Sequence, residues 1–95
     1  MATQTLLNAA TASARSRKVG NFNGSGEVLI ALRGTIGSGS ATIDISLDGG
    51  SNWCPTGAVF SSSDTGAKLV ACPSEALLSV NYTAGGGSSW TVEAI

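Results

Sequence analysis

Hydrophobic and polar residues alternate along much of this chain with a period of two, the pattern of half-buried β-strands. No segment shows the 3.6-residue period of an amphipathic helix. Short stretches rich in glycine, serine and asparagine separate the alternating segments, and these residues favour tight turns. The pattern predicts seven or eight short strands, with candidates at residues 3–8, 14–19, 27–33, 41–47, 57–60, 67–72, 76–82 and 89–95.

The same alternation predicts which side chains face the core, because successive residues of a strand point to opposite faces. Residues Thr42, Asp44 and Ser46 are expected on the outer face of their strand. Leu29 and Ala31 make both faces of residues 27–33 apolar, so we expect that strand in mid-sheet or at a subunit contact. The residues expected to face inward are Val28, Ile30, Leu32, Ile43, Ile45, Leu47, Leu78, Val80, Tyr82, Trp90, Val92 and Ala94.

Strands that recur every few residues between glycine-rich turns are typical of an all-β fold. We therefore expect a single small antiparallel β-sandwich, with either jelly-roll or immunoglobulin-like connections. The 95 residues suit one domain spanning 1–95. Residues 1–12, rich in alanine and threonine, could form a strand or an extended N-terminal arm.

Charged residues make up only 12% of the chain, and the net charge is −1. There is no overall basic excess that would point to nucleic acid or to an anionic membrane. The longest apolar run, residues 28–32, is too short to span a bilayer, and the N-terminus does not read as a signal peptide. We expect a chain folded in the cytoplasm. Lysine and proline, which usually protect strand edges, are scarce, so some edges or faces are expected to be covered by partners.

The residue types needed for common catalytic and metal sites are missing or scattered. The chain has no histidine, which excludes Ser-His-Asp and Cys-His catalysis and histidine-bound metals. The acidic residues are dispersed and form no calcium-binding loop. Residues 34–42 have the glycine spacing of a phosphate-binding loop but lack its lysine and lead into a strand. We predict no catalytic, cofactor or metal-binding residues and no enzymatic activity.

The chain has two cysteines, Cys54 and Cys72, each followed by proline. Without histidine, two sulfurs cannot complete a four-ligand zinc site within one chain. A disulfide between them is possible, although a cytoplasmic environment favours reduced thiols. Whether the two cysteines are bonded stays open at this point.

Residues 46–53, SLDGGSNW, resemble the Asp-box of sialidases, with Asn52 where threonine is usual. In that motif the aspartate accepts hydrogen bonds from turn amides, glycine takes a positive φ, and tryptophan packs under the hairpin. The motif occurs once here, in a chain too short for a propeller. We predict a structural turn made by Asp48, Gly49 and Gly50 and anchored by Trp53.

Three of the five basic residues, Arg15, Arg17 and Lys18, form the one basic cluster of the sequence. They could contact an acidic partner surface or nucleic acid. A solvated strand face is the simpler interpretation, since alternation places Arg15 and Arg17 on one side. We keep these three residues, together with Leu29, as possible partner contacts.

Three glycine-containing segments follow one another along the chain: GSGEVLIALRGTIG (24–37), ATIDISLDGGSNW (41–53) and TGAKLVACP (65–73). In this order they resemble small β-sandwich virion proteins encoded among the structural genes of tailed bacteriophages. Some proteins of this class are decoration, or cement, proteins that sit on the outer capsid surface and clamp neighbouring capsid subunits.

This resemblance implies a non-enzymatic capsid decoration protein that binds the major capsid protein and stabilises the shell. It implies a homo-oligomer, with a trimer favoured. The protein would be made in the host bacterial cytoplasm and located on the capsid surface. No nucleic-acid or membrane partner is expected. The alternative is a tail- or fibre-associated module that binds carbohydrate or a host receptor. An exposed tryptophan or tyrosine on a flat face would favour that alternative, but Trp90 and Tyr82 are expected in the core.

Overall fold

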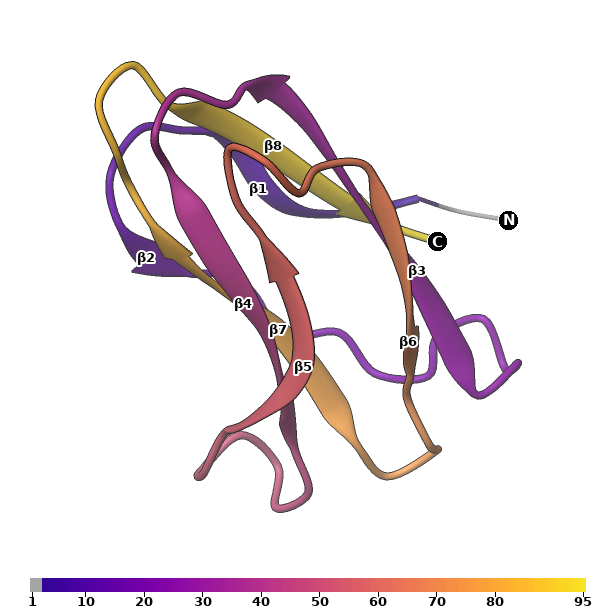
Figure 1. Ribbon diagram of the computed structural model, residues 1–95. Coiled ribbons are helices and arrows are strands. Elements are labelled where there is room, and N and C mark those ends of the chain that lie inside the picture. Colours follow the sequence, from indigo (N-terminus) through magenta and orange to yellow (C-terminus); the bar gives the residue numbers. More distant parts are fainter. Residues whose placement is uncertain (1–2) are drawn as a thin grey trace.

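A computed structural model describes residues 3–95, which form two packed antiparallel sheets (Figure 1). The predicted all-β sandwich is confirmed, and all eight candidate segments contain a strand. The strands are β1 (Gln4–Ala10), β2 (Ala14–Arg15), β3 (Glu27–Thr35), β4 (Ser40–Ser46), β5 (Cys54–Phe60), β6 (Ala67–Ala71), β7 (Leu77–Thr83) and β8 (Ser89–Ala94).

The strand order identifies the connections as those of a jelly roll. One sheet, the first sheet, has the order β1-β8-β3-β6, and the other, the second sheet, has the order β2-β7-β4-β5. The pairs β1·β8, β2·β7, β3·β6 and β4·β5 are those of one long hairpin folded over itself, with β4 and β5 at its tip. Eight strands wound in this way form the jelly-roll sandwich. Of the two topologies that the sequence left open, the structure therefore has the jelly roll.

The predicted inward faces form most of the core. Trp90 lies at its centre, fully buried, with Tyr82 at 4.9 Å and Phe60 edge-on at 6.3 Å between ring centroids. The Trp90 indole N–H donates to the Ile36 carbonyl at 2.9 Å, so its one polar group is satisfied. The prediction is confirmed for the buried residues Val28, Ile30, Leu32, Ile43, Leu78, Val80, Tyr82, Trp90, Val92 and Ala94.

One prediction for residues 41–47 is wrong, and two residues on the predicted outer face are nevertheless buried. Leu47 is 79% exposed, because β4 ends at Ser46 and Leu47 already belongs to the turn. Asp44 and Ser46 lie on the outer face, as the alternation requires, but both are buried. Asp44 is covered by its ion pair with Arg15, and Ser46 by the hydrogen bonds that its hydroxyl makes in the following turn.

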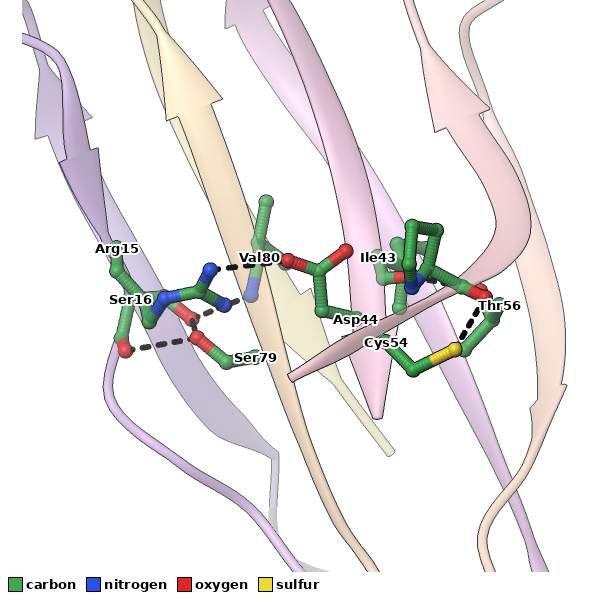
Figure 2. Close-up of polar contacts among 9 residues, drawn as sticks. Arg15, Ser16, Ile43, Asp44, Cys54, Thr56, Ser79 and Val80 are labelled. Atoms are coloured by element: carbon green, nitrogen blue, oxygen red, sulfur yellow. Dashed lines mark hydrogen bonds and ion pairs between the residues drawn. The ribbon is translucent and has the colours of Figure 1, made fainter. Parts of the chain in front are cut away.

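Strand β2 is much shorter than the predicted segment 14–19. Its ladder with β7 stops after Arg15, where the Ser16 hydroxyl accepts the Val80 N–H at 2.8 Å in place of a backbone carbonyl (Figure 2). The chain returns to β7 at Val19, which exchanges two backbone hydrogen bonds with Leu78. A side chain that competes for a ladder hydrogen bond interrupts the strand.

The N-terminal segment pairs within the domain over residues 4–10, so there it is a strand and not an extended arm. Residues 1–2 of the predicted arm lie outside the described residues. Strand β1 is an edge strand with two register shifts, and Ala9 has a φ of 49°. Such irregularities discourage another strand from pairing with an edge.

The other long edges carry the scarce lysine and proline. On β5, Pro55 cannot donate a ladder hydrogen bond, and Gly57 has a φ of 90°. On β6, the partly buried Lys68 places its Nζ atom 2.8 Å from the Asp64 carboxylate and 5.6 Å from the centre of the Phe60 ring. These features hinder another strand from pairing with β5 or β6. The two edges therefore do not need a partner to cover them, contrary to the expectation from the sequence.

Candidate functional site

The Asp-box-like turn has the internal hydrogen bonds that its sequence predicts. Asp48 accepts the Asn52 backbone N–H at 2.9 Å and the Asn52 side-chain amide at 2.7 Å. The Ser46 hydroxyl donates to Asp48 at 2.7 Å and accepts the Gly50 N–H at 2.8 Å. Gly49 and Gly50 have φ values of 79° and 100°, which favour glycine. Asn52 thus supplies two donors at the position where threonine is usual.

These hydrogen bonds lower the pKa of Asp48 to about 2, with the Asn52 side chain as the largest cause. The backbone N–H of Asn52 and the Ser46 hydroxyl add to the effect, because each donates to the charged carboxylate. Asp48 therefore stays ionised over the neutral range and holds the turn as an acceptor.

Trp53 does not pack into the core beneath this turn. It is half-buried on the outer face of the second sheet, and the Arg15 guanidinium carbon lies 4.8 Å from the centre of its ring. The same guanidinium contacts Asp44, with Nη2 and Oδ2 3.0 Å apart. Arg15 thus links a carboxylate on β4 to an aromatic ring at the start of β5. The Trp53 ring is thus covered by Arg15 of β2, and its role as the anchor of the turn stays a prediction.

Asp44 is the unusual member of this arrangement. Its side chain is 7% exposed, and its Oδ1 atom has no hydrogen-bond partner among the described residues. In Figure 2, Arg15, Ser16 and Ser79 lie on one side of Asp44, and Cys54 and Thr56 lie on the other. Its neighbour across the β4–β5 ladder is Pro55, which has no N–H to offer. Arg15 is therefore the main compensation for this buried charge.

The fold brings Lys18 of the basic cluster beside the turn, a proximity that the sequence alone did not reveal. Lys18 lies against the turn, its Nζ atom 3.5 Å from the Gly49 carbonyl oxygen. Arg17 is exposed, whereas Arg15 is partly covered by Trp53 and Asp44. Residues 15–17 are exposed, buried and exposed in turn, as the alternation predicts, although β2 itself ends at Arg15.

The outer face of the first sheet is apolar where β6, β3 and β8 lie side by side. Leu29 is paired with Leu69 on β6 and exchanges two backbone hydrogen bonds with Ile95. Directly paired residues point to the same face. We call Leu69, Leu29 and Ile95 the apolar row; they are 61%, 38% and 41% exposed. The next row along the strands is formed by Ala67, Ala31 and Glu93.

A groove of about 330 Å³ lies beside the apolar row, where the edges of the two sheets separate. Its lining comes from both layers and is mostly apolar, and Leu69 belongs to the groove and to the row. The lining residues are Ile45, Thr56, Ala58, Leu69, Val70 and Ala71. The apolar surface therefore continues from the sheet face around its β6 edge.

Both cysteines are free thiols, which answers the question left open by the sequence. Cys54 is exposed at the start of β5, and Cys72 is buried. Burial raises the pKa of the Cys72 thiol. Within residues 3–95, no three histidine, cysteine or acidic side chains gather in a way that could hold a metal ion. The described chain also has no helix of the length and apolarity needed to cross a membrane.

Comparison with known proteins gives no relative. No family model matches the chain, no curated protein matches it, and no solved structure matches it.

Proposed function

We propose that this protein is a non-enzymatic structural component of a tailed-bacteriophage virion, a decoration or cement protein that binds the outer capsid surface. The observation that carries the proposal is the apolar row on an open sheet face, next to strand edges that are blunted. An exposed apolar face with protected edges suits side-chain packing against another folded protein, without strand addition. Such a surface is expected of a protein that functions as part of a larger assembly.

The major capsid protein is the proposed partner. The basic cluster follows the start of β2, in the second sheet, and could offer the exposed charges of Arg17 and Lys18 to an acidic capsid surface. A protein that binds the assembled shell and not its separate subunits stabilises the shell by mass action. A homo-oligomeric unit that touches several capsid subunits would also gain avidity. The proposed location is thus the capsid surface, after synthesis in the host cytoplasm.

The alternative, a tail or fibre module that binds carbohydrate or a receptor, has less support. Trp90 and Tyr82 are both buried in the core and cannot form a stacking platform for a sugar. Trp53 is half-buried, and Arg15 lies over its ring. The jelly roll itself occurs in capsid proteins and in lectins, so the fold does not choose between them.

Quantitative mass spectrometry of purified particles tests the proposal, with the major capsid protein as the internal reference. We expect a copy ratio near one, or a simple fraction of one, and a shell that resists heat less well when this protein is removed. A few copies per particle would favour the tail or fibre alternative. Complete absence from particles would overturn the virion proposal.

A further inference from the structure

The apolar face of the first sheet has large and small residues arranged around one level of the sheet. On β3, Leu29 and Ala31 lie one residue to either side of Ile30 and both point outward. On β6, Leu69 and Ala67 lie in the same way about Lys68, which is the ladder partner of Ile30. On these two strands each large side chain therefore has a small counterpart at the mirrored position, whereas on β8 the counterpart of Ile95 is Glu93.

If a two-fold axis crossed the strands at this level, each large residue of β3 and β6 would meet a small residue of the second copy, and each such contact would form twice. This axis lies in the contact plane, perpendicular to the strands, at the level of Ile30. It places each strand opposite the same strand of the second copy, running in the antiparallel direction. Leu29 of each molecule then lies over Ala31 of the other, and Leu69 over Ala67. Side chains from two facing sheets interdigitate at a separation of about 10 Å, which requires large residues opposite small ones.

The same two-fold axis also brings opposite charges on β3 together. Glu27 and Arg33 are equally distant from Ile30 along the strand, and both are exposed. The two-fold axis therefore brings Glu27 of each molecule opposite Arg33 of the other. Arg33 uses its Nε atom on Glu93 at 2.7 Å, and a guanidinium has further N–H donors to offer. Glu27 takes part in none of the ion pairs among residues 3–95.

We propose that the occupant of the apolar face is a second copy of this chain, packed face to face across this two-fold axis. An isologous interface needs one surface that is complementary to itself. On β3 and β6 this face is self-complementary in size, and on β3 it is also self-complementary in charge. The unit would thus be a dimer, in place of the trimer expected from the resemblance. The inference rests on the proposed function in that it names the unit that would bind the shell. The second sheet of each copy, with the basic cluster, would face away from the contact.

Sedimentation velocity of the isolated full chain, across the micromolar concentration range, tests the inference directly. We expect a reversible monomer–dimer equilibrium. Leu69→Glu would bury two unpaired carboxylates in the contact and should weaken the dimer by about a hundredfold or more. Leu47→Glu is the matched control, because it introduces the same charge at a leucine that is exposed elsewhere, and it should leave the dimer constant unchanged.

Charge inversion provides a second test that does not depend on the apolar residues. Glu27→Arg alone would face arginine with arginine and should weaken the dimer by about tenfold. Adding Arg33→Glu and Glu93→Arg inverts the whole set, so it restores opposite charges both within and between copies. This triple variant should recover most of the lost affinity.

A wild-type chain that is monomeric at every concentration, or that forms trimers, would overturn the two-fold inference. So would a dimer that Leu69→Glu leaves intact, or a triple variant as weak as Glu27→Arg. A monomer found on particles in a simple ratio to the capsid protein would overturn this inference and leave the proposed function standing. A dimer that is absent from particles would support the inference and overturn the proposed function.

Discussion

Arg15 lies over the ring of Trp53, with the guanidinium carbon 4.8 Å from the ring centre. The two residues belong to segments far apart in the sequence, the short strand β2 and the turn before β5. Between them on the same face lies Asp44, whose Oδ2 atom is 3.0 Å from the guanidinium. One side chain thus neutralises a buried carboxylate and covers an aromatic ring. Because β2 forms only a short ladder, the contacts of Arg15 with Asp44 and Trp53 also help to hold this segment against the second sheet.

Arg15→Ala should lower the free energy of unfolding by about 2 kcal/mol, since it leaves the buried Asp44 carboxylate without its ion-pair partner. Urea denaturation at neutral pH measures the change. Arg17→Ala is the control, because Arg17 is exposed, and it should change stability by less than about 0.5 kcal/mol. Combining Arg15→Ala with Asp44→Asn should recover part of the loss. Additive effects of the two substitutions would contradict the proposed coupling.

The turn carboxylate Asp48 should give stability a specific dependence on acid pH. Its folded-state pKa is about 2, against an ordinary value of 3.8. A lowered folded-state pKa stabilises the protein above the ordinary value, and the contribution is lost as pH falls toward the folded value. Asp48→Asn should therefore flatten the decline of the unfolding midpoint between these two pH values. Glu75→Gln, at an exposed acid, should leave the slope unchanged.

Gly34→Ala should destabilise the fold by about 3 kcal/mol, from backbone strain and a close contact. Gly34 has a φ of 106°, and an added Cβ would overlap the Ser89 carbonyl oxygen on the neighbouring strand. Gly24→Ala isolates the strain, since Gly24 has a φ of 73° but open space around it, and it should cost about 1 kcal/mol. Equal losses in thermal unfolding would show that the contact with Ser89 does not matter.

The two thiols should differ sharply in reactivity. Cys54 is exposed and Cys72 is buried, so a water-soluble disulfide reagent should label one thiol per native chain quickly. Complete labelling should require denaturant, since burial also raises the pKa of Cys72 and reduces its thiolate fraction. Cys54→Ser should abolish the fast phase, and Cys72→Ser should leave it. No fast labelling of the native protein would contradict the placement of Cys54.

Local periodicity was sufficient to predict the strands and most of the core. In residues 89–95, Trp90, Val92 and Ala94 alternate with polar residues and all three are buried. The turn at residues 46–53 was also predictable, because aspartate and consecutive glycines specify its hydrogen bonds and its positive φ values. Where the alternation failed, at Leu47, the strand had ended one residue earlier than the pattern indicated.

The sequence by itself determined the all-β class, the inward faces and the Asp-box-like turn, because these depend on neighbours along the chain. Only the tertiary structure decided the jelly-roll order, the contacts of Arg15 with Asp44 and Trp53, and the apolar row of Leu69, Leu29 and Ile95. These features depend on which strands pair and in which register. That choice is made by the packing of the whole sandwich, through contacts between segments far apart in the chain.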